Sequence, residues 1–177
     1  MIDLDENKIL ETERLLLREV SADDAEFVLD LLNQSSFKQY IGDRGVRTLE
    51  QAREYIASRF TKSYRDNGFG LYLLELKASA EPIGLCGFVS RETLPAPDIG
   101  FALLPQFEKQ GYAYEASSAM MSYGREKLGL ERVLAITTID NVSSGRLLEK
   151  IGLRFDREIS LNGETLKLYS TNSNGEG

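Results

Sequence analysis

Residues 98–116 read DIGFALLPQFEKQGYAYEA, and this stretch decides the fold because it joins a strand to a helix through a short loop. The apolar run Ile99–Leu104 predicts a strand, and Pro105 ends it because proline has no N–H to donate to a sheet. Gly111 then allows the backbone to approach a ligand closely before the helix begins. Successive N–H groups of residues Lys109–Ala113, at the positive end of that helix, favour a phosphate.

The phosphate hypothesis has a plain alternative, because a structural turn between a strand and a helix satisfies the same pattern. Neither common nucleotide fingerprint is present. The chain lacks G-x-x-x-x-G-K-[ST], and the loop holds a single glycine, so the P-loop and the dinucleotide-binding motif are both excluded.

The composition limits the chemistry that is possible. The 177 residues, of which 42% are hydrophobic, fit a single domain over residues 1–177, with a core at about 12–172. The chain has no histidine, and its one cysteine, Cys86, lies in an apolar run with no histidine to activate it; we expect a core residue there, and no disulfide, zinc cluster or bound metal. Carboxylates, hydroxyls, backbone groups or a cofactor must therefore carry any reaction.

The charge and the hydropathy pattern bear on partners and location. With 28 acidic and 21 basic residues the net charge is -7, which argues against direct binding of nucleic acid and suits a basic partner. Solubility alone also explains such a charge. No apolar run approaches the roughly 20 residues of a membrane span, and the acidic N-terminus does not resemble a signal peptide, so we expect a cytoplasmic protein without membrane contact.

Alternating and helical periodicities predict seven strands and four helices in the order β-α-α-β-β-β-α-β-α-β-β. A loop is expected over residues 33–47, followed by a capping box at Thr48 and Gln51. The fold class is α+β, with a mixed, mostly antiparallel sheet and one parallel pair that splays apart around a ligand. The expected strands are 14–19, 69–77, 83–91, 99–104, 132–138 and two more around the Asn162-Gly163 turn, and the expected helices are 23–32, 48–64, 111–128 and 142–150.

A second stretch, residues 140–158 or DNVSSGRLLEKIGLRFDRE, adds a family resemblance. It is similar to the N-x-x-S-x-x-L-L-E-K-x-G-F/L signature of the GNAT superfamily of acetyltransferases, and the first stretch resembles the pyrophosphate loop of that superfamily. The segment TERLLLRE, from Thr12, and the strand DIGFALLP resemble the ribosomal-protein N-terminal acetyltransferase branch, the RimJ/RimL type. The match runs in order over roughly residues 12–172.

The resemblance implies a three-layer GNAT fold that binds acetyl-CoA. One strand would hydrogen-bond the pantetheine arm, the loop amides would hold the pyrophosphate, and Asn141 would bind the arm from the other side. Ser144 corresponds to a serine near the thioester sulfur and would assist the departing thiolate. The simpler alternative is that Asn141 and Ser144 only cap their helix. The implied acetyl-CoA residues are Phe101, Ala102, Leu103, Lys109, Gln110, Gly111, Tyr112, Ala113, Asn141 and Ser144.

Catalysis of acetyl transfer needs a base for the amine, a donor for the carbonyl oxygen and an exit for the thiolate. Asp98 matches a position where relatives carry a glutamate proposed as the base, although a solvated acid at a strand start is an equal alternative. Relatives often carry a tyrosine acid after the asparagine, and Gly145 and Arg146 stand there instead, which shifts the leaving-group role to Ser144. Tyr40 either lines the acceptor pocket or holds in place the loop between the first two expected helices.

Two departures from the family pattern concern the pyrophosphate loop. Glu108 replaces the usual Arg or Gln, and Lys109 replaces the usual glycine. We expect the backbone cradle to survive, with Glu108 unfavourable beside a phosphate unless it points away. Arg146 and Lys150 either reach the CoA phosphates or form a solvated helix face.

The sequence thus predicts an N-acetyltransferase that moves an acetyl group from acetyl-CoA directly to a primary amine. The acceptor is the N-terminal amine of a protein, such as a basic ribosomal protein, or a small-molecule amine. A non-catalytic acyl-CoA-binding module is the alternative from another class. A monomer and a homodimer are both compatible with the sequence.

Overall fold

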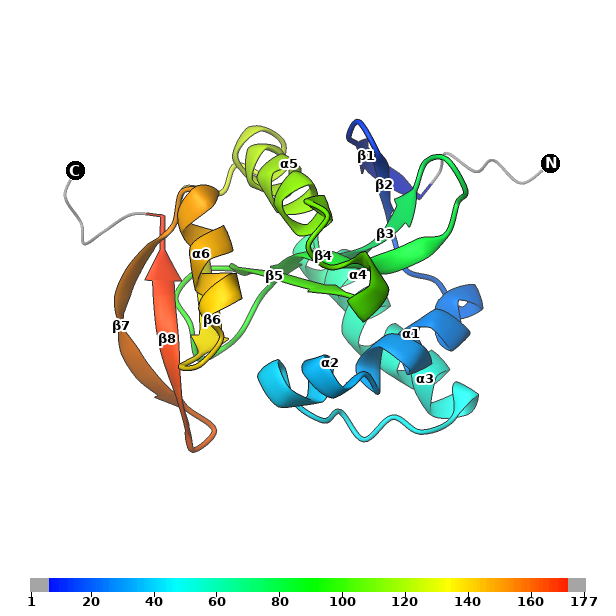
Figure 1. Ribbon diagram of the computed structural model, residues 1–177, viewed down its shortest axis with the longest axis horizontal. Coiled ribbons are helices and arrows are strands. Elements are labelled where there is room, and N and C mark those ends of the chain that lie inside the picture. Colours follow the sequence, from blue (N-terminus) through cyan, green and yellow to red (C-terminus); the bar gives the residue numbers. More distant parts are fainter. Residues whose placement is uncertain (1–6, 172–177) are drawn as a thin grey trace.

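The computed structural model describes residues 7–171, which form an eight-stranded mixed sheet with helices on both faces (Figure 1). The strand order is β1-β2-β3-β4-β5-β6-β8-β7, and every neighbouring pair is antiparallel except β5 and β6. The strands are β1 (Lys8–Glu11), β2 (Leu15–Arg18), β3 (Leu71–Leu76), β4 (Pro82–Val89), β5 (Asp98–Leu103), β6 (Leu134–Thr138), β7 (Arg154–Leu161) and β8 (Glu164–Ser170).

The helices form two layers, one on each face of the sheet (Figure 1). Residues of α5 and α6 join one buried cluster, and residues of α1, α2 and α3 join a second one. The α-helices are α1 (Ala25–Leu32), α2 (Ser35–Tyr40), α3 (Leu49–Tyr55), α4 (Lys62–Asn67), α5 (Tyr112–Glu126) and α6 (Val142–Lys150). A π-helical turn, residues 56–61, joins α3 to α4 into one continuous helical segment. The predicted three-layer α+β architecture is confirmed.

The parallel pair is joined at one end only. Within the described part of the chain, β5 and β6 pair at Asp98↔Leu134, and Leu134 N donates to Pro97 O at 2.9 Å. On its other side β5 pairs with β4 from Asp98 through Leu103, and β6 pairs with β8 along its length. The strands therefore part immediately after Asp98, which leaves an open end between two supported strands. This is the predicted splay.

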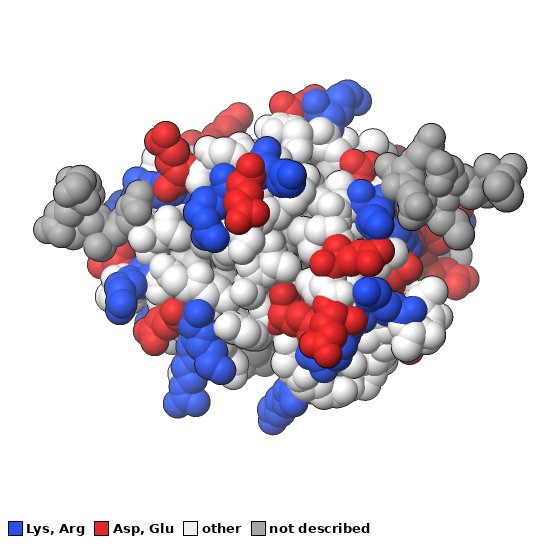
Figure 2. Space-filling view, turned by 90° about the horizontal axis from the view of Figure 1, so that it is seen from above, with Lys and Arg blue, Asp and Glu red and all other residues white. Residues whose placement is uncertain are grey.

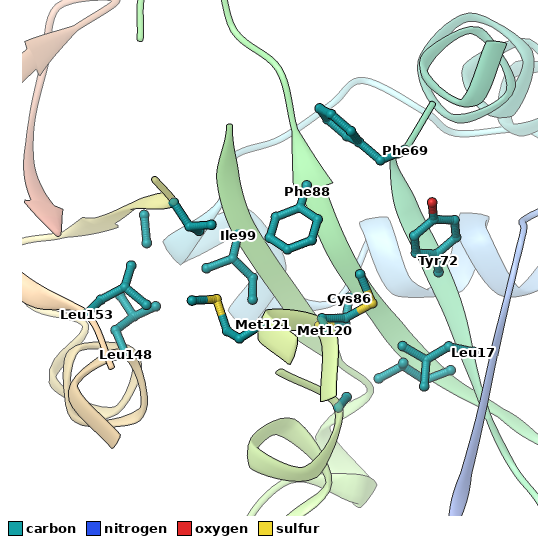
Figure 3. Packing of buried hydrophobic residues seen from close by; sticks show 14 of the residues in the cluster. Leu17, Phe69, Tyr72, Cys86, Phe88, Ile99, Met120, Met121, Leu148 and Leu153 are labelled. Carbon is teal, nitrogen blue, oxygen red and sulfur yellow. The ribbon is translucent and has the colours of Figure 1, made fainter. Parts of the chain in front are cut away.

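The larger buried cluster locks α5 onto the sheet beside this opening. Met120 and Met121 of α5 reach toward Cys86 and Ile99 of the sheet (Figure 3). Each such side chain, when fully buried, stabilises the fold by roughly 1.5–3 kcal/mol. Within α5, Ala116 and Met120 are buried, whereas Ala113 and Tyr123 are half-buried. The helix is thus held at its middle and leaves its first turn accessible.

Three elements differ from the sequence prediction. Strand β1 has no apolar alternation of its own and exists because it pairs with β2, a tertiary contact. The expected loop at 33–47 contains the short helix α2, which Phe37 anchors in the second buried cluster. The helix expected to end near Tyr64 continues to Asn67, where Gly68 in the left-handed region ends it at φ 77°. The capping box at Thr48 and Gln51 and the Asn162-Gly163 hairpin turn are confirmed.

Acidic and basic side chains are interspersed on the surface above α5, with neutral areas between them (Figure 2). A continuous basic field, which nucleic-acid binding needs, does not cover this face. Among residues 7–171, no helix combines the length and the apolar character of a membrane span.

Candidate active site

The first part of the candidate site is the free edge of β5. Phe101, Ala102 and Leu103 pair with Cys86, Leu85 and Gly84 of β4. All three side chains are half-buried: Phe101 and Leu103 pack against the α5 side of the sheet, and Ala102 packs against the other side. A ligand arm with amide groups can pair with such an edge as an additional strand does, which is the role the resemblance implied.

The second part is the loop from β5 to α5. After a 3-10 turn at Pro105–Phe107, the residues from Glu108 to Gly111 are exposed. Lys109 and Gly111 both adopt left-handed conformations, with φ 61° and φ 84°. Gly111 is the N-cap of α5 and has no side chain with which to cap the helix. The first N–H groups of α5, near Tyr112 and Ala113, are consequently available to an anion.

The third part is the junction between β6 and α6. Asn141 is the N-cap of α6, and its Oδ1 accepts a hydrogen bond from Ser144 N at 3.3 Å. Asn141 therefore caps the helix with its side chain, and Ser144 takes part in this cap through its backbone N–H. Both side chains remain half-buried, so they stay accessible at the end of β6. Gly152 follows the helix in a left-handed conformation, at φ 106°.

Asp98 lies at the closed end of the splay and is 2% exposed. Its Oδ1 accepts from Arg91 Nε at 2.9 Å. Burial raises the pKa of Asp98, and the Arg91 guanidinium lowers it less, so the pKa lies above its ordinary value. The alternative of a solvated acid at a strand start is wrong: Asp98 is a buried carboxylate with one cationic partner.

Two residues at the open end were not anticipated from the sequence. Thr137 and Thr138 are 7% and 9% exposed, and their hydroxyl oxygens have no hydrogen-bond partner among the residues described. Because Ala135 belongs to the cluster under α5 and α6, strand alternation directs Thr137 to the same face and Thr138 to the opposite one. A buried hydroxyl without a partner costs about 1–3 kcal/mol, which a bound ligand can recover. Two consecutive threonines in a strand look like ordinary β-formers, so the sequence carries no signal for this role.

The remaining sequence candidates lie at different places. Tyr40 ends α2, in the helix layer opposite α5 and α6, and is half-buried. Cys86 is a fully buried core residue, and burial raises the pKa of its thiol to about 12. Lys150 lies over the Tyr114 ring, 5.5 Å from its centroid, and Arg146 is exposed. Residues 7–171 contain no cluster of three metal-ligating side chains.

Tyr169 occupies the region where the sequence lacks the family's tyrosine acid. A Cβ added to Gly145 would lie 2.6 Å from the Tyr169 hydroxyl, so that hydroxyl fills the space beside the first turn of α6. Burial and the nearby Glu149 raise the pKa of Tyr169. A side chain at position 145 would therefore have to displace the Tyr169 hydroxyl, which approaches from β8.

The sequence profile of the acetyltransferase (GNAT) domain matches residues 14–154, which include the free edge of β5, the loop and the Asn141 junction. The chain belongs to the GNAT acetyltransferase family. An uncharacterized N-acetyltransferase of Bacillus subtilis, YoaA, is 33% identical over 147 residues, which are 82% of each chain. This GNAT protein is accordingly an N-acetyltransferase, and acetyl-CoA is the acyl donor that the family uses.

Solved structures agree with the GNAT fold. A putative GNAT-family acetyltransferase from Bordetella pertussis superimposes with a TM-score of 0.78 at 25% identity, over 92% of this chain and 98% of that one. RimL, described as a ribosomal L7/L12 alpha-N-protein acetyltransferase in complex with coenzyme A, gives a TM-score of 0.77 at 18% identity, over 92% and 96% of the chains. At that identity RimL supports the fold alone.

Proposed function

We propose that this GNAT enzyme transfers an acetyl group from acetyl-CoA directly to the N-terminal α-amine of a protein. The observation that supports acetyl-CoA binding most strongly is the open end of the β5–β6 pair beside the uncapped start of α5. A strand edge suits the amides of the pantetheine arm, and free N–H groups suit the pyrophosphate. Both features lie at the carboxyl end of β5, so one elongated ligand can engage both.

The proposed donor contacts follow the two junctions. Phe101, Ala102 and Leu103 present the strand edge, and Lys109 to Ala113 present backbone amides to the pyrophosphate. Asn141 contacts the arm from β6 while it caps α6, and Thr137 supplies a buried hydroxyl on the same face as α5 and α6. The amides and thioester of the arm offer that hydroxyl the partner it lacks.

The proposed chemistry rests on two side chains and the backbone. Asp98 accepts the amine proton, directly or through a water, and its raised pKa suits a base better than that of a solvated carboxylate. An N–H of β5 faces the developing oxyanion, and Ser144 stabilises the departing thiolate. Because both substrates are held together, much of the rate comes from their placement.

The proposed acceptor rests on the branch resemblance and the fold. The TERLLLRE and DIGF segments resemble the RimJ/RimL branch, and the RimL structure has the same fold over most of this chain. The net charge of -7 suits a basic protein such as a ribosomal one. Tyr40, on the helix layer opposite the donor loop, lines the acceptor side in this proposal. A small-molecule amine is the second candidate acceptor.

The decisive experiment measures CoA thiol release with acetyl-CoA and a panel of N-terminal peptides, polyamines and amino acids. The double variant D98N/S144A should reduce the rate about 10²–10⁴-fold. Calorimetry should give it an acetyl-CoA Kd within about threefold of that of the wild type. The exposed pair D66N/S58A is the matched control and should keep its rate.

Each alternative has its own outcome in the same experiment. A wild type that binds acetyl-CoA and releases no thiol with any acceptor supports a non-catalytic binding module. Thiol release with polyamines and none with peptides moves the acceptor to small amines. Undetectable acetyl-CoA binding contradicts both functions.

A further inference from the structure

The TERL segment at the start of β2 takes no part in the chemistry, yet its side chains lie against the pyrophosphate loop. Arg14 Nη1 donates to the Gln110 carbonyl at 3.0 Å. The Arg14 guanidinium also lies over the Tyr112 ring, 4.2 Å from its centroid. A Cβ added at Gly111 would lie 3.2 Å from Arg14 Nη2. Arg14 therefore lies against Gln110, Gly111 and Tyr112, where the loop enters α5, almost 100 positions away in sequence.

Glu115, in the first turn of α5, fixes the direction of Arg14. Its Oε1 accepts from Arg14 Nε at 2.7 Å, and its Oε2 accepts from Arg14 N at 2.9 Å and from the Thr12 hydroxyl. Burial raises the pKa of Glu115, but these hydrogen bonds and the guanidinium lower it by more. The pKa therefore lies below its ordinary value, and Glu115 stays ionised. The carboxylate thus ties β2 to α5 at the point where the loop enters the helix.

The geometry of the peptide unit links this contact to ligand binding. In a trans peptide the C=O and the following N–H point in opposite directions. When Arg14 holds the Gln110 carbonyl toward β2, the Gly111 N–H is directed away from β2. The hydrogen bond from Arg14 therefore selects the side of the loop on which that donor is presented.

The loop also needs support that its own sequence does not supply. Lys109 has φ 61°, a conformation that costs a residue with a side chain roughly 1–2 kcal/mol. Glu108 and Glu115 both lie near the proposed dianion site, and only Glu115 is neutralised by Arg14. An arginine serves better than a lysine here because its planar fork can serve Glu115 and Gln110 at once.

We propose that Arg14 is a positioning residue that shapes the loop of residues 109–113 for the pyrophosphate of acetyl-CoA, with Glu115 and Thr12 as its anchors. This inference rests on the proposed function, because it assumes that the loop binds the pyrophosphate. Arg14 itself does not contact the ligand; it acts through the Gln110 carbonyl.

The test compares ligands with and without the pyrophosphate. R14Q should weaken CoA binding about 10-fold or more in calorimetry, the loss expected for a hydrogen bond from a charged group. S-acetylpantetheine, which keeps the arm and lacks the pyrophosphate, should bind the variant and the wild type equally. R14K should fail as R14Q does, because it keeps the charge and loses the fork. Full recovery in R14K would contradict the positioning role.

R47Q is the matched control. Arg47 is similarly exposed, 48% against 41% for Arg14, and pairs with Asp43 in a loop on the α2 side of the sheet. This variant should bind CoA as the wild type does. An R14Q protein that binds CoA normally, while the wild type binds it, overturns the inference and leaves the proposed function intact. A wild type that does not bind CoA overturns the proposed function instead.

Hydrogen exchange in the ligand-free protein provides a second test that does not depend on any affinity. R14Q should accelerate exchange of the amides at residues 109–113 and leave β3 and β4 unchanged. Acceleration throughout the sheet would mean that Arg14 supports the whole fold, and unchanged loop amides would mean that it does not shape the loop. Either result overturns the inference.

Discussion

The two strand-to-helix junctions that flank the open end are built on opposite principles. From β6 to α6 the chain takes three residues, and the Asn141 side chain caps the helix that follows it. From β5 to α5 the chain takes eight residues, passes through two left-handed positions and begins the helix at a glycine. The first junction is capped by a residue of its own, whereas the second receives a hydrogen bond from Arg14, which directly precedes the distant strand β2.

The difference separates two tasks, because one helix start is fixed by its own cap and the other keeps free N–H groups that can bind an anion. A helix start that is capped by a side chain has fewer free N–H groups to offer a ligand, whereas an uncapped one presents them at an energetic cost. Helix α6 is capped, and its junction contributes the Asn141 and Ser144 side chains to the candidate site. Helix α5 is uncapped, and in our proposal the contact from Arg14 offsets the energetic cost of its free N–H groups.

The largest expected effect comes from giving the α5 junction a side chain. G111A places a Cβ at φ 84° and close to Arg14, so we expect a loss of acetyl-CoA affinity of about 10-fold or more, measured by calorimetry. G129A is the matched control, because Gly129 has φ 67° and open space around its Cβ position. Equal affinity losses in both variants would show that strain alone, and not the site, is responsible.

At the α6 junction, capping and binding can be separated. N141A should lower the free energy of unfolding by about 1 kcal/mol in urea titration, because it removes the N-cap. N141D should restore the stability, since aspartate also caps, and should not restore acetyl-CoA affinity, since it lacks the amide donors. If N141D recovers both properties, Asn141 acts as a cap and nothing more.

The threonines of β6 test which face of the open end receives the donor. T137V should leave the unfolding free energy unchanged or slightly higher, because it removes a buried hydroxyl without a partner, while acetyl-CoA binds about 3- to 10-fold more weakly. T138V, on the opposite face, should have the same stability and normal acetyl-CoA affinity. A larger affinity loss in T138V would reverse the assignment of the faces.

The smallest effect is expected where the loop departs from the family pattern. K109G removes the steric cost of the left-handed backbone at Lys109, but it also raises the conformational entropy of the unfolded chain. These two effects on the free energy of unfolding are about 1 kcal/mol each and oppose one another. We expect unfolding free energy and CoA affinity to change little, within about threefold for the Kd. A large gain in affinity would mean that Lys109, rather than Arg14, controls the shape of the loop.

Much of this molecule could be predicted from local sequence. The Asn141 cap, the capping box at Thr48 and the Asn162-Gly163 turn were all predictable, because each is encoded by residues a few positions apart. The parallel pairing of β5 with β6 was predictable because a helix lies between the two strands in the sequence. The replacement of the family's glycine by Lys109 was also visible in the sequence, whereas the left-handed backbone at this residue was found in the structure.

Other features depend on contacts between distant segments. Strand β1 forms because β2 is available to pair with it, and the burial of Asp98 with Arg91 follows from the packing of three strands. The partnerless hydroxyls of Thr137 and Thr138 arise because β5 parts from β6, which no local pattern records.

The sequence by itself therefore determined the strand-loop-helix unit at residues 98–116, its likeness to an acetyl-CoA loop and its pairing with the Asn141 junction. Only the tertiary structure decided how that loop is held and which side it offers to a ligand. The physical reason is the range of the interactions: caps and turns are made by neighbouring residues, whereas the Arg14 contacts join segments that come together only when the sheet has formed.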